Sequence, residues 1–229
     1  MVNMKAILFS SDFIGLNATQ ELERLVGKKA RDINFAIINE ACAVEDGDDN
    51  SFFVEGMYFI KNNFGKFYLI NLLALSLNEA KSRIEKSDVI FCFGGNTEYL
   101  KTVFDKTGFS AVLSELLKAK VWCGSSAGSM VLGRMIDSTW QSKLYGEFND
   151  YGVESYLDLL DFSILPHLTG GDLASDVNDK IVFDISANMS WDIYALSDWS
   201  AVLVDGSKVR VIGKSWTKLW NGKILKNNK

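Results

Sequence analysis

The chain has 229 residues, of which 48% are hydrophobic and 23% are charged, and its formal net charge is −5. This length suits one larger α/β domain or two small ones, and the composition is that of a globular protein. The acidic balance offers no basic surface to a nucleic-acid backbone or to an anionic membrane, so we expect neither as a partner.

The first apolar segment, KAILFS at residues 5–10, follows close after the amino terminus. It is too short for the hydrophobic region of a signal peptide or for a membrane span, and it is typical of a first β-strand. No later segment approaches the ~20 uninterrupted apolar residues that a membrane-spanning helix needs. We therefore expect a cytoplasmic protein.

Short apolar runs alternate with amphipathic stretches through the first half of the chain. The runs lie at residues 5–10, 33–39, 67–73, 88–95 and 120–124, and the helical patterns at residues 17–28, 50–65, 76–88, 97–108 and 110–120. Ser76 and Glu79 have the spacing of a capping box at the start of the third helix. Because each strand is apolar on both faces and is followed by a helix, the pattern predicts an α/β fold. Its expected core is a doubly wound, mostly parallel sheet covered by helices on both faces.

The second half is less regular. Residues 160–168 and 192–198 are expected to add further central strands to the sheet, with a helix near residues 172–188 between them. Two β-branched runs flank Asp205 and Gly206, which predicts an antiparallel hairpin near the carboxyl terminus. No linker, repeat or low-complexity tract interrupts the sequence, so we expect a single domain over residues 1–229.

The cysteine and histidine content bears on metal sites and on redox chemistry. Cys42, Cys92 and Cys123 are widely spaced, form no CxxC pair and are accompanied by one histidine. They are expected to be reduced thiols that pack as small hydrophobic residues. We expect no metal site and no organic cofactor.

The most informative motif is Gly124-Ser125-Ser126-Ala127-Gly128, which lies between a predicted strand and a predicted helix. A Gly-x-Ser-x-Gly turn at this position is typical of a nucleophilic serine, because it lifts the central side chain above the sheet. A Cβ at either flanking position would clash. The following helix directs free N–H groups at the reacting centre, so Ser126 is the candidate nucleophile and the Ala127 N–H a candidate oxyanion donor. The alternative is an ordinary glycine-rich turn.

A second strand–helix turn, FGGNTEYL at residues 93–100, is expected beside the first. Gly94 and Gly95 allow a ligand to approach the backbone, Asn96 tolerates turn geometry, and Thr97 can cap the helix. In a doubly wound sheet both turns open at the carboxyl ends of neighbouring strands, where ligands bind. We therefore expect Gly94, Gly95 and Asn96 to contact substrate, with the Gly95 N–H as a second oxyanion donor.

A serine nucleophile needs a base and a carboxylate that orients the base. His167 is the only histidine and follows a predicted strand, and Asp198 ends another, with Asp137 as the competing carboxylate. This order of Ser, His and Asp differs from that of α/β-hydrolases, which weighs against a lipase or esterase. The other acidic clusters are expected to be solvated: Asp46, Asp48 and Asp49 in a loop, and Asp172, Asp176 and Asp179 on a helix, where Asp172 could contact substrate.

Together these motifs resemble peptidase family S51, which includes aspartyl dipeptidases and cyanophycinases. The resemblance rests on GGNTEYL, GSSAGSMVLG, LPH and AVLVDGSKVRVIG, which occur in the family's order from about residue 4 to residue 213. It implies a fold similar to that of class I glutamine amidotransferases. It also implies Ser126 as nucleophile, His167 as base, Gly95 and Ala127 as oxyanion donors, and Asp198 at the position where an aspartyl dipeptidase has glutamate.

The chain departs from the family pattern at two places. Phe93 stands where the family often has a third glycine, and the acidic stretch LTGGDLASDVND follows His167 where aspartyl dipeptidases have an arginine. The second departure weighs against selectivity for an N-terminal aspartate and makes a neutral or basic substrate side chain at least as plausible.

We therefore expect a serine peptidase that acts on short peptides, with a homodimer as one possible state. Two alternatives are another serine amidase or esterase that uses the same residues, and a non-catalytic binding protein of the same fold.

Overall fold

The structure is a computed structural model that describes residues 4–11, 18–45, 51–168 and 178–228. Some acidic residues discussed above lie outside the described residues: Asp46, Asp48, Asp49, Asp172 and Asp176. Within the described part of the chain, no helix has both the length and the apolar character that crossing a membrane would require.

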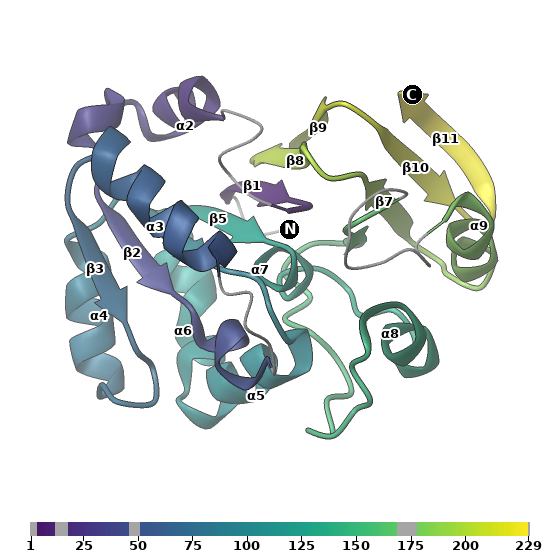
Figure 1. Cartoon of the computed structure of the whole chain (residues 1–229), viewed down its shortest axis with the longest axis horizontal. Helices are drawn as coiled ribbons and strands as arrows, with labels where there is room; N and C mark the ends of the chain where they lie inside the picture. Colours follow the sequence, from purple (N-terminus) through teal and green to yellow (C-terminus); the bar gives the residue numbers. More distant parts are fainter. Residues whose placement is uncertain (1–3, 12–17, 46–50, 169–177, 229) are drawn as a thin grey trace.

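A seven-stranded sheet with the order β3-β2-β4-β5-β1-β8-β9 forms the centre of the fold (Figure 1). The first five strands are parallel, whereas β8 pairs antiparallel with β1 and with β9. Their bounds are β1 Lys5–Phe9, β2 Phe35–Ile38, β3 Phe67–Ile70, β4 Val89–Cys92, β5 Val121–Ser125, β8 Ser200–Asp205 and β9 Lys208–Gly213. The mostly parallel α/β sheet predicted from the sequence is thus confirmed.

Helices cover both faces of this sheet because successive strand residues point to opposite sides. In β1, Ile7 and Phe9 pack in the cluster that holds α2 and α3, whereas Ala6 and Leu8 pack in the cluster that holds α4, α5 and α6. The predicted capping box of α4, between Ser76 and Glu79, is present. The helices are α2 Thr19–Val26, α3 Ser51–Asn63, α4 Leu77–Glu85, α5 Thr97–Lys106, α6 Phe109–Leu116, α7 Ala127–Met130, α8 Ser138–Tyr145 and α9 Asp179–Ala187.

A second sheet of four strands has the order β11-β10-β7-β6. Its strands are β6 Phe162–Leu165, β7 Asp192–Leu196, β10 Trp216–Trp220 and β11 Lys223–Asn228. The expectation that the first two would be central strands of the main sheet was wrong. The antiparallel strand β8 occupies the free edge of β1, while β6 and β7 pair with each other and β7 also pairs with β10.

The two sheets share one apolar cluster. Phe162 of β6 and Leu196 of β7 pack in the same cluster as Ala6 and Leu8 of β1. In Figure 1, β7, β10 and β11 lie to the right of β1 and β8, with α9 against them. The carboxyl ends of β6 and β7 are therefore brought toward the carboxyl end of β1.

The predicted hairpin joins β8 to β9. Asp205 pairs with Lys208 across the turn, and Gly206 has a φ of 62°, which glycine adopts without a steric cost. The helix expected near residues 172–188 is described only from residue 178 onward, where Asn178 caps α9.

Candidate active site

Ser126 occupies the turn between β5 and α7. Its backbone has φ 47° and ψ −112°, a strained conformation for a residue with a side chain. A Cβ on Gly124 would lie 2.2 Å from the Gly128 carbonyl oxygen, and a Cβ on Gly128 would lie 2.2 Å from the Cys92 carbonyl oxygen. The close approach of these backbones explains why glycine stands on both sides of Ser126.

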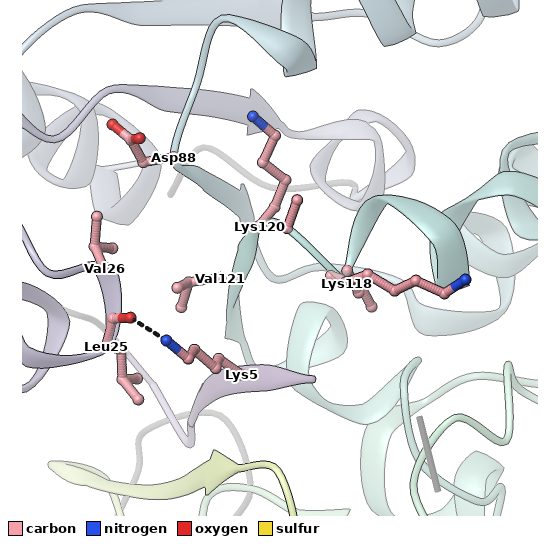
Figure 2. A pocket seen from close by; sticks show the side chains of 9 residues that line it. Lys5, Leu25, Val26, Asp88, Lys118, Lys120 and Val121 are labelled. Atoms are coloured by element: carbon pink, nitrogen blue, oxygen red, sulfur yellow. Dashed lines mark hydrogen bonds between the residues drawn. The ribbon is translucent and has the colours of Figure 1, made fainter. Parts of the chain in front are cut away.

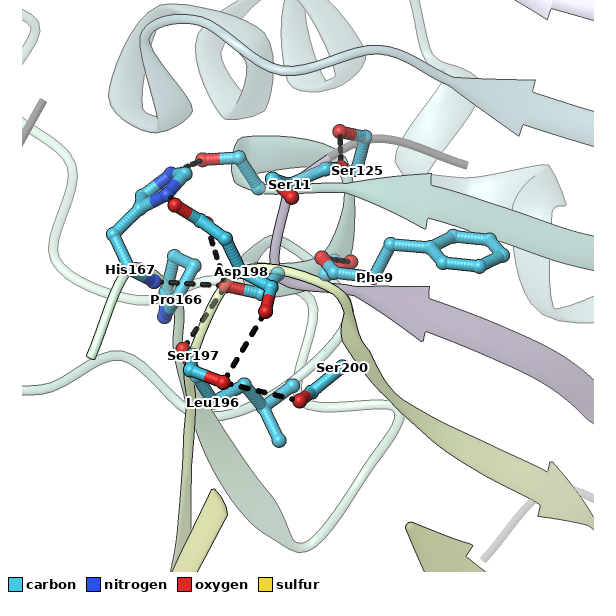
Figure 3. Close-up of polar contacts among 12 residues, drawn as sticks. Phe9, Ser11, Ser125, Pro166, His167, Leu196, Ser197, Asp198 and Ser200 are labelled. Carbon is cyan, nitrogen blue, oxygen red and sulfur yellow. Dashed lines mark hydrogen bonds and ion pairs between the residues drawn. The ribbon is translucent and has the colours of Figure 1, made fainter. Parts of the chain in front are cut away.

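His167 and Asp198 form a row of hydrogen bonds with Ser126. The Nε2 atom of His167 lies 3.1 Å from the Ser126 Oγ, and its Nδ1 atom lies 2.8 Å from the Asp198 Oδ1. His167 follows β6 and is 7% exposed, while Asp198 follows β7 (Figure 3). The structure thus brings together three of the residues selected from the sequence, although they come from different sheets.

The Asp198 carboxylate can orient the His167 ring because it is ionised and accepts a hydrogen bond from Nδ1. Burial alone would raise the pKa of this carboxyl group, but the hydrogen bond and the charge of His167 outweigh that effect and lower the pKa below its usual value. Asp198 therefore remains a carboxylate wherever the imidazole is neutral, and it accepts a hydrogen bond from the Nδ1–H tautomer. That tautomer leaves Nε2 free to accept a proton from Ser126.

Ser125 and Asp137 lie outside this row. The Ser125 hydroxyl donates a hydrogen bond to the Ser11 carbonyl oxygen, as Figure 3 shows, and is directed away from His167. Asp137 is exposed and caps α8, where its carboxylate accepts a 2.9 Å hydrogen bond from the Thr139 N–H. The competing carboxylate therefore has a structural partner of its own.

The turn at residues 94–96 lies against Ser126. A Cβ on Gly94 would be 3.1 Å from the Ser126 Cβ, and Gly95 has a φ of 126° that favours glycine. Asn96, rather than Thr97, caps α5 by accepting a 2.8 Å hydrogen bond from the Tyr99 N–H. Within the described chain the N–H groups of Gly95 and Ala127 donate no hydrogen bond to protein atoms, so both are available to a ligand.

Two residues near the site had no role in the sequence analysis. Ser10 is fully buried and its hydroxyl accepts a 2.8 Å hydrogen bond from the His167 N–H. Glu147 is 4% exposed, accepts a 2.6 Å hydrogen bond from the Thr97 N–H, and has its pKa raised by burial to about 7. The serine pair after the first strand was a signal for Ser10, whereas no sequence pattern marked Glu147.

A cavity of about 190 Å³ lies at the opposite end of the main sheet, near the start of β1 and β5 (Figure 2). Its lysines are already engaged: the Lys5 ammonium donates to the Leu25 carbonyl oxygen, and the Lys120 ammonium donates to the Glu85 carbonyl oxygen. Both ammonium groups therefore already donate to backbone carbonyl oxygens. Across the described residues, no three His, Cys, Asp or Glu side chains come close enough to hold a metal ion.

Two of the three cysteines have the buried character expected of thiols that pack as small hydrophobic residues. Cys92 and Cys123 are fully buried, and burial raises the pKa of both. Cys42 is only partly buried, and its thiol donates a 3.0 Å hydrogen bond to the Gly94 carbonyl oxygen. All three are free thiols.

Known peptidases are similar to this chain in sequence. An uncharacterized peptidase of Listeria innocua is 28% identical over 177 residues, which cover 75% of this chain and 79% of that protein. Peptidase E of Pasteurella multocida is 27% identical over 158 residues, which cover 63% of this chain and 64% of that protein.

Solved structures share the fold. The crystal structure of a protein assigned to peptidase E from Listeria monocytogenes EGD-e has a TM-score of 0.73 at 21% identity and covers 92% of this chain and 98% of that chain. A peptidase from an acI-B1 Actinobacterium has a TM-score of 0.67 at 14% identity, with 98% of both chains covered. The sequence model of peptidase family S51 matches residues 10–212. The chain therefore belongs to peptidase family S51 and is a serine-type peptidase.

Proposed function

We propose that this peptidase hydrolyses short peptides through a triad of Ser126, His167 and Asp198. The observation that carries the proposal is the continuous row of contacts, 3.1 Å from Ser126 Oγ to His167 Nε2 and 2.8 Å from His167 Nδ1 to Asp198 Oδ1. Both distances are within hydrogen-bond reach, which a nucleophile and its base require.

In the proposed reaction, the Ser126 Oγ attacks the scissile carbonyl carbon while His167 Nε2 takes the hydroxyl proton. The C–N bond then breaks, and the same nitrogen returns the proton to the leaving amine. Water then attacks the carbonyl carbon of the acyl-enzyme while His167 Nε2 takes its proton. The ester bond to the Ser126 Oγ breaks, His167 returns the proton to that oxygen, and the carboxylic acid product is released. Asp198 holds the imidazole in the required tautomer and stabilises the imidazolium that forms transiently.

The backbone N–H groups of Gly95 and Ala127 are the proposed oxyanion donors. They lie in the turns that follow the adjacent parallel strands β4 and β5, and both N–H groups lack a partner among the described residues. Donors of this kind stabilise the negative charge that develops on the carbonyl oxygen. Gly94 supports the same role because its missing side chain leaves room beside Ser126.

A short peptide is the proposed substrate class, and the acidic residues after His167 favour a neutral or basic side chain over aspartate. A fluorophosphonate probe followed by intact-mass measurement tests the nucleophile. One adduct on the wild type and none on Ser126→Ala is the expected result, and an unlabelled wild type would overturn the proposal.

The substrate class is tested separately with a dipeptide library and with p-nitrophenyl esters. We expect turnover of dipeptides with neutral or basic N-terminal residues to exceed turnover of Asp-containing dipeptides. Turnover of esters without turnover of any peptide would instead favour the esterase alternative on the same residues.

A further inference from the structure

The proposed triad is divided between two sheets. Ser126 follows β5 of the seven-stranded sheet, whereas His167 and Asp198 follow β6 and β7 of the four-stranded sheet. Among the described residues, no strand pairing joins the two sheets, so the distance between nucleophile and base depends on contacts other than a β-ladder. A displacement of about 1 Å in a catalytic group can cost about 10²-fold in rate, so these contacts matter for turnover.

The carboxyl end of β1 supplies contacts to both halves. The Phe9 carbonyl oxygen accepts a 3.1 Å hydrogen bond from the Ser126 N–H. It also lies 2.8 Å from the Ser129 Oγ, which is 2.7 Å from the Gly124 carbonyl oxygen. The next residue, Ser10, continues the pairing with β8 through a 2.9 Å hydrogen bond from its N–H to the Ser200 carbonyl oxygen. Phe9, the last residue of β1, thus binds the backbone of Ser126, and Ser10 follows it directly in the chain.

The Ser10 side chain reaches across to the second sheet. Its hydroxyl accepts the 2.8 Å hydrogen bond from the His167 N–H and donates a 3.0 Å hydrogen bond to the carbonyl oxygen of Leu196, the last residue of β7. The same oxygen lies 3.4 Å from the Asp198 Oδ1. Since a hydroxyl has one proton, the shorter contact to Leu196 is the better of the two donor interactions.

The backbone of His167 depends on this contact. It has a φ of 63°, in the left-handed region that a residue with a side chain occupies at a cost. Its N–H is buried, so the loss of the Ser10 acceptor would leave an unsatisfied donor unless the turn rotated. Any such rotation would carry the imidazole away from Ser126.

We propose that Ser10 is a positioning residue that sets the distance between His167 and Ser126. It does so through the hydrogen bonds that link the end of β1 to the His167 N–H and the Leu196 carbonyl oxygen. This inference rests on the proposed triad. Ser10 has no contact with the reacting atoms, so its removal is expected to lower kcat and to leave KM close to that of the wild type.

The test compares Ser10→Ala with Ser186→Ala. Ser186 is also fully buried, and its hydroxyl also accepts a hydrogen bond from a backbone N–H, that of Gly222 at 3.1 Å. The control therefore removes the same kind of bond away from the site. We expect kcat to fall about 100-fold in Ser10→Ala, because a displacement of about 1 Å in a catalytic group has an effect of this size. In Ser186→Ala we expect kcat to stay at the wild-type value.

A proton NMR spectrum reports the environment of the His167 ring, which a general loss of stability would not change in the folded protein. His167 is the only histidine, so its Nδ1–H resonance is uniquely assigned. We expect this resonance to shift or broaden in Ser10→Ala and to remain in place in Ser186→Ala. If Ser10→Ala does not fold, the same measurements are made on Ser10→Cys, because a thiol fills the space of the hydroxyl but accepts hydrogen bonds weakly.

The outcomes separate the two proposals. Labelling of the wild type that survives in Ser126→Ala would reject the triad itself. Correct labelling, together with a Ser10→Ala or folded Ser10→Cys variant that keeps the wild-type kcat and His167 resonance, would reject the role of Ser10 alone. A lowered kcat with a displaced resonance supports both.

Discussion

Ser126 and His167 belong to different sheets, yet the Ser126 Oγ lies 3.1 Å from the His167 Nε2. Both residues have a positive φ, 47° for Ser126 and 63° for His167. Strained backbone is retained where the surroundings determine it strongly, and it gathers at functional sites. This relationship supports the proposal that Ser126, and not the neighbouring Ser125, is the nucleophile.

Ser126→Ala is expected to abolish probe labelling and peptide hydrolysis, whereas Ser125→Ala is expected to keep measurable activity. Only the Ser126 hydroxyl contacts the imidazole, while that of Ser125 is bonded to the Ser11 carbonyl oxygen. Intact mass after fluorophosphonate treatment and a dipeptide assay measure the two effects. Labelling that persists in Ser126→Ala would contradict the assignment.

Activity is expected to rise with pH through a single ionisation. The imidazole of His167 must be neutral to accept the serine proton, and the lowered pKa of Asp198 keeps its carboxylate charged throughout that transition. The dependence of kcat/KM on pH gives the profile, and an NMR titration follows the only histidine directly. A flat profile from about pH 5 to 8 would argue against a Ser–His mechanism.

Asp198→Asn is expected to lose far more activity than Asp137→Asn. An amide at position 198 keeps the shape but favours the wrong ring tautomer, which costs on the order of 10⁴ in rate in the chymotrypsin-type triad. Asn caps a helix about as well as Asp, so the change at position 137 should affect neither α8 nor activity. Steady-state kinetics and thermal midpoints measure both variants, and a crippled Asp137→Asn beside an active Asp198→Asn would identify a different third member.

Glu147→Gln is expected to make stability less dependent on pH. Burial raises the pKa of Glu147 from 4.5 to about 7, so between these values the folded state holds a proton that the unfolded state releases. The free energy of unfolding therefore falls as pH rises through this range. The loss is on the order of 3 kcal/mol, because one pKa unit corresponds to about 1.4 kcal/mol.

Urea unfolding at a series of pH values from about 5 to 8 measures this effect. Glu147→Gln should reduce the slope relative to the wild type and should exceed the wild type in stability at the alkaline end. The exposed Glu115, whose carboxylate pairs with Lys118, serves as the control as Glu115→Gln. Equal slopes in all three proteins would show that Glu147 does not hold the proton.

Local sequence patterns were sufficient to predict the strand and the turn that carry the proposed nucleophile, Ser126. The apolar runs that became β1 to β5 face a core on both sides, and the glycines around Ser126 satisfy contacts between backbones that any side chain would block. The Asp205-Gly206 turn likewise determines its hairpin through residues adjacent in the chain. His167 and Asp198 were identified because each follows an apolar run of this kind.

The tertiary structure alone decided which strands pair and which buried groups meet. The sequence of an apolar strand does not specify which strand pairs with it. The placement of β6 and β7 in a second sheet depended on β8 pairing with the edge of β1 and on β10 pairing with β7. Ser10 and Glu147 acquire their importance through contacts with His167 and Thr97, far away in the chain. Periodicity reports whether a residue is buried, whereas the partner of a buried polar group is set by long-range packing.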